Sequence, residues 1–238
     1  LGYSRGAFAV RSLAGIIDRV GLLRPHAATE RNVDMAYRHY QSKTVKAAAL
    51  SFSEAFCHDT IEIEMVGVWD TVKALGIIMP VLWRLSVPAH AFHDHTLGPS
   101  ISHGYHALAF NETRMVYNTV LWDVPESFSE RIEQVWFRGN HSDIGGHLHG
   151  FHAARPLSNI PFVWMLERMA RHGVSLPDGW QKRFEMDVTA PSTGNWRGWT
   201  KLFVTRRRRK TLRDPSERLH DTLRDFHALD ARRGPVLE

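Results

Sequence analysis

The chain opens on a serine flanked by two glycines, and an apolar helical pattern follows immediately. Residues 1–6 read Leu-Gly-Tyr-Ser-Arg-Gly, so Gly2 lies two residues before Ser4 and Gly6 two residues after it. Such a G-x-S-x-G pattern is typical of a strained turn from a strand into a helix, in which the glycines relieve crowding around an exposed serine. The backbone N–H of Arg5 then lies free at the helix N-terminus, where it can bind a developing oxyanion. Alone, the pattern is a weak indicator of catalysis, because Gly-Ser turns are common.

The composition is that of one globular domain. The 238 residues are 43% hydrophobic, which supports a single core and a single domain over residues 1–238. A formal net charge of +5 favours anionic partners such as phospholipid or nucleic acid without distinguishing them. Cys57 is the sole cysteine, which excludes an internal disulfide. The longest apolar stretch, residues 74–83, is too short to span a membrane, so we expect a soluble protein.

Hydrophobic periodicity predicts a chain in which helices alternate with strands. We expect helices from the serine turn to Gly21, at 29–55 (two helices), at 106–114 (short, with a turn), at 159–172 and at 214–226, and strands at 61–69 and 132–137. The strand at 61–69 begins with alternating residues and then becomes continuously apolar, which is typical of a strand in a buried parallel sheet.

Two polar side chains follow directly after the predicted strands. Asp70 follows the strand at 61–69, and His141 follows the strand at 132–137 in a Gly-rich loop. A serine hydroxyl needs a base to attack near neutral pH, imidazole is suited to that task, and a carboxylate can orient the imidazole. The chain order Ser4, Asp70, His141 is that of α/β hydrolases. We therefore expect a Ser-His-Asp triad at the carboxyl edge of a mostly parallel sheet, in a three-layer α/β-hydrolase-like sandwich.

Other interpretations of the acid remain open. Asp70 could instead cap the turn that follows its strand. Asp143 is a rival, but it is only two residues from His141, and we expect it to shape the loop together with Gly145 and Gly146. The weaker alternatives are Asp59 and Asp123.

Several stretches closely resemble an uncharacterised α/β-hydrolase family that includes type VI secretion phospholipase effectors. They are residues 2–8, 11–15, 67–72, 135–146 and 157–165, so the resemblance extends to about residue 176. It implies a serine esterase that acts on lipid esters, with Ser4, Asp70 and His141 at the matching motif positions. We expect no cofactor and no metal in this site. It also implies a bacterial protein whose candidate partners are phospholipid, an anionic membrane surface, a secretion apparatus and an immunity protein.

The chain departs from this family at three places. Members usually open with a strand that ends in an Asp-Gly-Thr turn near the nucleophile, where a second oxyanion donor would lie. Only one residue precedes Gly2, so we expect the N-terminal strands to be missing. Residues 110–114 read Phe-Asn-Glu-Thr-Arg, where members have a more acidic sequence similar to Leu-Asp-Glu-Arg. Residues 146–150 stand where members have a more Gly-rich sequence.

Residues 77–105 do not continue the alternation of helical and strand patterns. They are interpreted either as a lid over the cleft that touches an acyl chain, or as a loop that covers the core. A histidine cluster raises a metal hypothesis, but its spacing matches no standard zinc signature; its members are His90, His93, His95, His103 and His106. His147, His149 and His152 are a second metal candidate together with Asp143, although solvated loop histidines are the plainer interpretation.

The segment at 178–238 is expected to be peripheral. Its cations at 206–210, Arg-Arg-Arg-Arg-Lys, could bind anionic lipid or nucleic acid, but such a run is more often a solvated face. Nucleic acid is the less favoured partner, because no known binding module is present. Three hypotheses follow: a phospholipase-type serine esterase, a non-catalytic protein that binds anionic lipid or nucleic acid through the basic run, and a His-based metal hydrolase.

Overall fold

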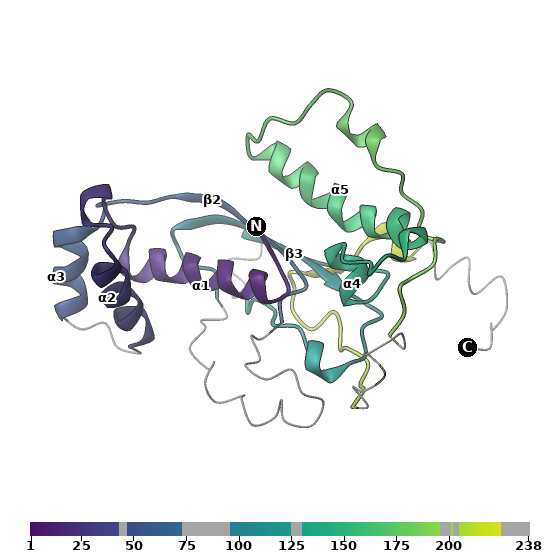
Figure 1. Ribbon diagram of the computed structural model, residues 1–238, viewed down its shortest axis with the longest axis horizontal. Helices are drawn as coiled ribbons and strands as arrows, with labels where there is room; N and C mark the ends of the chain where they lie inside the picture. Colours follow the sequence, from purple (N-terminus) through teal and green to yellow (C-terminus); the bar gives the residue numbers. More distant parts are fainter. Residues whose placement is uncertain (43–46, 73–95, 125–129, 196–200, 202–204, 225–238) are drawn as a thin grey trace.

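Within the part of the chain that the structure describes, five parallel strands form a central sheet (Figure 1). The computed structural model describes residues 1–42, 47–72, 96–124, 130–195, 201 and 205–224. The strands are β1 (Gly2–Tyr3), β2 (Ile63–Trp69), β3 (Ile101–Ala109), β4 (Ile132–Phe137) and β5 (Glu217–Leu219), and they lie in this order across the sheet. Every neighbouring pair is parallel, so the carboxyl ends of all five strands meet at one edge.

Helices cover both faces of this sheet. The α-helices are α1 (Arg5–Val20), α2 (Glu30–Gln41), α3 (Ala47–Phe56), α4 (His141–Gly145) and α5 (Arg155–Arg171). Short 3₁₀ helices span Pro25–Ala27, Met115–Tyr117, His152–Ala154 and Trp180–Arg183. The α1 helix packs on one face and α5 on the other, which makes three layers, and the predicted α/β-hydrolase-like fold with a parallel sheet is confirmed.

Two of the hydrophobic clusters lie between the sheet and its helices, and they follow from the alternation of side chains along the strands. On the α1 side, Ala7 and Ala14 pack against Val66 and Val68 of β2. On the α5 side, one cluster joins α5 to β3 and β4, and it includes Tyr105, Ala107, Val135, Phe137, Ile160, Trp164 and Met165. Small residues on α1 allow the helix to approach β2 closely, and this approach sets the position of the helix N-terminus.

The ends of the helices have local causes. The α1 helix ends at Val20 because Gly21 takes φ 103°, a backbone conformation that favours glycine. Thr29 caps α2 by accepting a hydrogen bond from the backbone N–H of Asn32. The predicted helices at 5–20 and within 29–55 are therefore confirmed. The helix predicted at 159–172 begins four residues earlier, at Arg155, because Pro156 is tolerated in a first helical turn.

The prediction of a short helix at 106–114 is wrong. His106 to Ala109 belong to β3, which lies between β2 and β4 and is almost entirely buried. Such a strand shows little alternation, so its sequence does not distinguish it from a helix. The same strand corrects the proposed lid, because residues 101–105 lie in the sheet; residues 77–95 lie outside the described residues.

The helix predicted at 214–226 is wrong over its first part, where Glu217–Leu219 forms β5. Glu217 is 7% exposed, and its carboxylate accepts hydrogen bonds from the backbone N–H groups of Leu212, Arg213 and Asp214. These bonds hold the preceding loop against the sheet and direct the chain into pairing with β4. This part of the 178–238 segment is therefore not peripheral.

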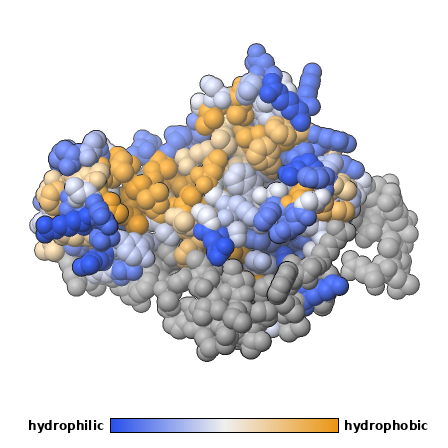
Figure 2. Space-filling model, viewed as in Figure 1, coloured by the Kyte–Doolittle hydropathy of each residue, from blue (hydrophilic) through white to orange (hydrophobic). Residues whose placement is uncertain are grey.

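The surface on the viewed face is partly hydrophobic. Figure 2 shows hydrophobic residues gathered over α1 and β2, with a further group over α5. Among the described residues, no helix combines the length and the apolar character needed to cross a membrane.

Candidate active site

Ser4 occupies the turn between β1 and α1. Its φ is 58° and its ψ is −120°, an unusual conformation for a residue other than glycine, and its backbone N–H donates to the carbonyl oxygen of Trp69 at 3.0 Å. A Cβ at Gly2 would lie 2.5 Å from the carbonyl oxygen of Gly6, so position 2 requires glycine. A Cβ at Gly6 would meet nothing within 4 Å, which corrects the expectation that Gly6 relieves crowding. Gly6 borders a pocket instead.

Asp70 lies immediately beyond β2, at the same sheet edge as Ser4. The register pairs Tyr3 with Trp69, so the residues that follow them leave the sheet side by side. Asp70 is fully buried and takes φ 42°. The backbone N–H of Ala109, at the end of β3, donates to its Oδ1 at 3.1 Å.

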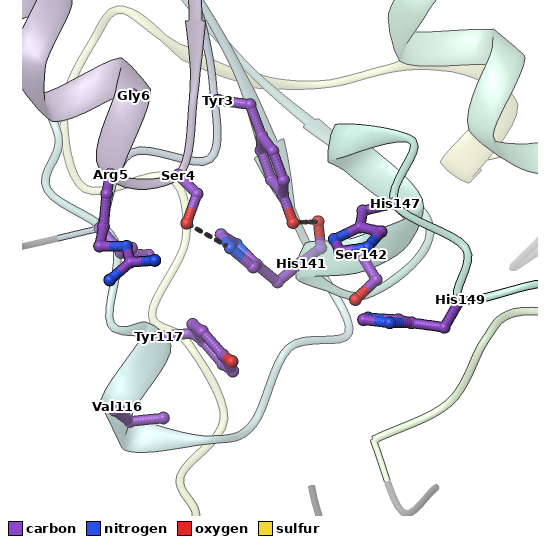
Figure 3. Close-up of a pocket in the computed structure, with 11 residues that line it drawn as sticks. Tyr3, Ser4, Arg5, Gly6, Val116, Tyr117, His141, Ser142, His147 and His149 are labelled. Carbon is purple, nitrogen blue, oxygen red and sulfur yellow. Dashed lines mark hydrogen bonds between the residues drawn. The ribbon is translucent and has the colours of Figure 1, made fainter. Parts of the chain in front are cut away.

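His141 is the first residue of α4 and lies between Ser4 and Asp70. Its Nε2 is 2.8 Å from Ser4 Oγ, and its Nδ1 is 2.6 Å from Asp70 Oδ2. Figure 3 shows the Ser4 hydroxyl directed at the imidazole. The structure thus brings together three side chains that are 137 and 71 positions apart along the chain.

Two aromatic rings hold the imidazole of His141 in place. The ring of Tyr117 stacks on it with 4.6 Å between centroids, and the ring of Tyr3 lies 4.8 Å away at a tilt. The Tyr3 hydroxyl donates to the backbone carbonyl oxygen of His141 at 3.1 Å (Figure 3). Burial, reinforced by the negative charge of Asp70, raises the pKa of Tyr3 far above its usual range, so the phenol remains a donor.

Glu112 is a supporting residue that the sequence did not single out. Its Oε2 accepts from the backbone N–H of His141 at 3.1 Å, and its carboxylate is also bound by Arg114. Nearby, the Asn111 side chain accepts from the backbone N–H of Gly139 at 2.8 Å. Residues 110–114, whose role the sequence left open, therefore tie β3 to the histidine loop. The Glu-x-Arg spacing was the available signal, because an arginine near a carboxylate can bind it with two nitrogens.

Asp143 contacts the backbone of the histidine loop and makes no hydrogen bond to the His141 ring. It accepts from the backbone N–H groups of Asn140 and Thr193, each at 2.9 Å, and from the Ser192 hydroxyl. Together with Asn140 it forms a capping box at the start of α4. The other alternative acids lie at the surface: Asp59 pairs with Arg24 at 2.9 Å, and Asp123 is exposed.

The two glycines after α4 have distinct roles. A Cβ at Gly145 would lie 2.0 Å from the ring of Tyr3, so glycine lets the tyrosine that contacts His141 fit against α4. Gly146 takes φ 75° and ends the helix in the left-handed conformation.

Arg209 reaches the site from the basic run and binds the carboxylate of Asp70 with two nitrogens. Its Nη1 is 2.5 Å from Oδ1 and its Nη2 is 2.9 Å from Oδ2. It also donates to the carbonyl oxygens of Ala109 and Tyr117, and its side chain is 4% exposed. The basic run is therefore not simply a solvated face, although Arg207, Arg208 and Lys210 are exposed.

These partners decide the charge of Asp70. Burial opposes its ionisation, but the guanidinium of Arg209 and the hydrogen bond from His141 outweigh burial and hold the pKa of Asp70 well below its usual range. The carboxylate is thus ionised throughout the neutral range, as an acid that orients an imidazole must be.

A pocket of about 490 Å³ opens beside Ser4. Its walls come from the serine turn, the 3₁₀ helix at 115–117 and the histidine loop (Figure 3). The lining residues are Tyr3, Ser4, Arg5, Gly6, Val72, Val116, Tyr117, His141, Ser142, His147 and His149. Arg5 begins α1, so its backbone N–H has no partner within the helix and lies beside Ser4.

The predicted histidine clusters do not assemble as the sequence suggested. His103 and His106 lie three residues apart on β3, so they project from opposite faces of the sheet. His106 is fully buried, where it accepts from the backbone N–H of Thr71 at 3.1 Å. His90, His93 and His95 lie outside the described residues. His147 and His149 stack with 4.1 Å between centroids, but in the described part of the chain the group that could hold a metal is Glu64, His103 and His172.

Comparison with known proteins identifies the family. Residues 1–168 match the model of the catalytic domain of Tle1-like phospholipase effectors of the type VI secretion system. The chain belongs to this family. The members of this family are described as phospholipase effectors.

A curated relative adds little about activity. The chain is similar to the uncharacterized protein YEL023C of Saccharomyces cerevisiae, with 33% identity over 107 residues that cover 39% of this chain and 15% of that protein. The chain thus spans only a small part of the length of this relative. No solved structure matches the chain.

Proposed function

We propose that this Tle1-like chain hydrolyses carboxylic ester bonds of phospholipids through Ser4, His141 and Asp70. One observation carries the proposal: an unbroken line of hydrogen bonds runs from Ser4 Oγ through both nitrogens of His141 to Asp70, with lengths of 2.8 and 2.6 Å. This is the arrangement that lets a neutral serine lose its proton as it attacks.

The reaction has two halves. Ser4 Oγ attacks the ester carbonyl carbon while its proton passes to His141 Nε2, and the imidazolium is stabilised by the ionised Asp70. When the tetrahedral intermediate collapses, the C–O bond to the alcohol breaks and His141 returns the proton to the leaving oxygen. Water then attacks the acyl-serine by the same route, which releases the fatty acid and restores Ser4.

The developing oxyanion needs donors that already point at it. In this proposal the backbone N–H of Arg5 is one donor, because it lies at the N-terminus of α1 next to Ser4. Gly6 contributes by leaving the adjacent space empty, since a side chain there would project into the pocket.

Arg209 is proposed as a positioning residue that acts through Asp70. Its guanidinium group binds both carboxylate oxygens of Asp70 at once, so the carboxylate cannot rotate and its Oδ2 stays directed at His141 Nδ1. Against the opposing effect of burial, the positive charge of Arg209 also lowers the pKa of Asp70, which keeps this carboxylate ionised beside His141.

The partners follow from the family and from the surface. Exposed Arg207, Arg208 and Lys210 supply positive charge that suits an anionic membrane surface. We propose a secretion apparatus and an immunity protein as macromolecular partners, because the matched family consists of type VI secretion effectors. A purely binding role for the basic run is disfavoured, because Arg209, one of its five cations, is committed to Asp70.

Activity on phospholipid micelles tests the proposal. Fatty acid released by the purified chain should fall by roughly 10⁴-fold or more in Ser4→Ala, because the nucleophile is lost while binding remains. The matched control is Ser12→Ala on the same helix, whose hydroxyl donates to the Phe8 carbonyl oxygen; it should keep the wild-type rate. Equal activity in Ser4→Ala and wild type would refute the assignment.

A further inference from the structure

A second cluster of ligand-type side chains lies near the opposite end of the sheet. Glu64 is the second residue of β2, His103 is the third residue of β3, and His172 follows the last residue of α5. Asp70 lies six positions after Glu64 along the strand, which is about 20 Å at 3.3 Å per residue. The cluster is therefore separate from the site around Ser4.

The three side chains already converge. One ligand atom from each lies within 4.8 Å of the others, and Glu64 Oε1 is 2.7 Å from His172 Nδ1. The rings of His103 and His172 are in contact, with 4.3 Å between centroids. Ligands at about 2.0–2.2 Å from a tetrahedral Zn²⁺ lie roughly 3.3–3.6 Å from one another, so small side-chain rotations would complete the geometry.

Two features distinguish this cluster from an ordinary ion pair. First, within the described part of the chain the ring nitrogens of His103 have no hydrogen-bond partner, although the ring is packed against His172 and Tyr105. Second, the Tyr105 hydroxyl lies 2.8 Å from His172 Nε2. A metal-bound imidazole commonly has such a partner on its other nitrogen, because the partner fixes the tautomer and the ring orientation.

We propose that Glu64, His103 and His172 bind a Zn²⁺ ion, with Tyr105 orienting His172. The ion takes the place of the proton between His172 Nδ1 and Glu64, and His172 then carries its proton on Nε2 and donates it to the Tyr105 oxygen. Two imidazoles and one carboxylate are ligands that Zn²⁺ prefers, whereas Ca²⁺ and Mg²⁺ prefer oxygen alone. The exposed Glu64 side chain leaves a path for the ion and a position for water.

The ion would have a structural role, because it ties β2, β3 and the end of α5 at the end of the sheet away from the serine. At a free Zn²⁺ concentration 100-fold above Kd, the melting temperature of the metal-stripped protein should rise by roughly 5–10 °C. Ca²⁺ and Mg²⁺ at the same concentration should leave it unchanged.

Titration of the metal-stripped full chain with Zn²⁺ tests the proposal, and Co²⁺ serves as the coloured probe. Wild type should bind one equivalent of Zn²⁺ tightly. The variants His103→Gln and His172→Gln should each lose this tight binding, and Zn²⁺ should no longer raise their melting temperature. Glu64→Gln is the variant at an exposed position, where misfolding is not an issue, and it should bind more weakly. Tyr105→Phe should weaken binding by about 10-fold, as expected for the partner of a ligand.

The controls separate this site from the rest of the protein. His147→Gln combined with His149→Gln removes the other stacked histidine pair and should leave the tight equivalent intact. Ser4→Ala should bind Zn²⁺ like wild type, whether or not the esterase proposal holds. The proposal is overturned if wild type binds no tight equivalent, or if His103→Gln and His172→Gln both retain it.

Discussion

At the residue scale, the candidate site consists of side chains whose neighbours leave them little freedom. His141 is held by Ser4 and Asp70 at its two nitrogens, by Tyr3 and Tyr117 at its ring, and by Glu112 at its backbone. Ser4, Asp70 and His141 could be predicted from the sequence, because Ser4 lies in a G-x-S-x-G pattern, Asp70 and His141 each follow a predicted strand, and the chain order is that of α/β hydrolases. Arg209 could not be predicted, because nothing local shows that one arginine of a basic run turns inward to a carboxylate. For Glu112 the only signal was its spacing to Arg114, which does not show that its carboxylate also accepts from the backbone of His141.

Replacing Arg209 should change the pH dependence of activity and not only its size. In Arg209→Met the carboxylate of Asp70 loses its fixed orientation, so we expect kcat to fall by about 10–100-fold with a smaller change in KM. Loss of the guanidinium also removes the largest of the influences that lower the pKa of Asp70, so Asp70 takes up its proton at a higher pH and the acidic limb of the kcat/KM profile should move to higher pH.

The conservative variant Arg209→Lys keeps the positive charge but loses the two-nitrogen contact to the carboxylate of Asp70. It should therefore keep the acidic limb close to the wild-type position while kcat stays reduced. An Arg209→Met enzyme with an unshifted profile would show that Arg209 stabilises only the fold.

At the element scale, the strands and helices position the site, because the carboxyl ends of the strands and the N-termini of α1 and α4 meet at one edge of the sheet. β2 and β4 could be predicted almost to the residue, since both follow a clear apolar pattern and end before a polar loop. β3 and β5 were missed for opposite reasons. β3 is buried on both faces and shows no period, whereas β5 is three residues long and depends on the bonds of Glu217.

The turn between β1 and α1 allows a matched comparison of its two glycines. Gly2→Ala should lower the free energy of unfolding by roughly 2–4 kcal/mol, because its Cβ would lie 2.5 Å from a backbone carbonyl. Gly6→Ala should leave it unchanged or raise it by up to about 1 kcal/mol, because the space is open and alanine favours a helix. Urea unfolding of both variants measures the difference. Equal destabilisation would mean that the close approach of β1 and α1 is not as described.

At the scale of the whole molecule, buried polar residues link the sheet to the site. His106, at the centre of the sheet, accepts from the backbone N–H of Thr71, next to Asp70, and its other nitrogen lies 3.4 Å from Gln134. The C-terminal part contributes β5 and Arg209, which the sequence placed at the periphery because no pattern in it signals long-range contacts. The fold and the site are therefore expected to lose stability together in acid.

His106 makes a specific prediction about that acid sensitivity. Burial, followed by the positive charge of Arg11, lowers its pKa from 6.5 to about 3. Because the folded-state pKa of His106 lies below its unfolded-state value, the contribution of the neutral imidazole to the free energy of unfolding is complete above pH 6.5. This contribution is lost as the pH falls from 6.5 toward 3. The loss approaches about 1.4 kcal/mol per pH unit.

Urea unfolding at pH 7, 6 and 5 measures this effect. His106→Gln cannot titrate at this position, so its free energy of unfolding should be lower at pH 7 but should fall less steeply with pH than that of wild type. Parallel pH dependences would mean that other groups cause the acid sensitivity.

Covalent labelling with a fluorophosphonate tests the central claim most directly, because the reagent reports an activated serine without any assumption about the lipid. The account predicts one adduct per chain, located by mass spectrometry on Ser4, and a labelling rate that falls by at least about 100-fold in His141→Gln. Failure of the folded wild type to react, or equal labelling of Ser4 in His141→Gln, would contradict it.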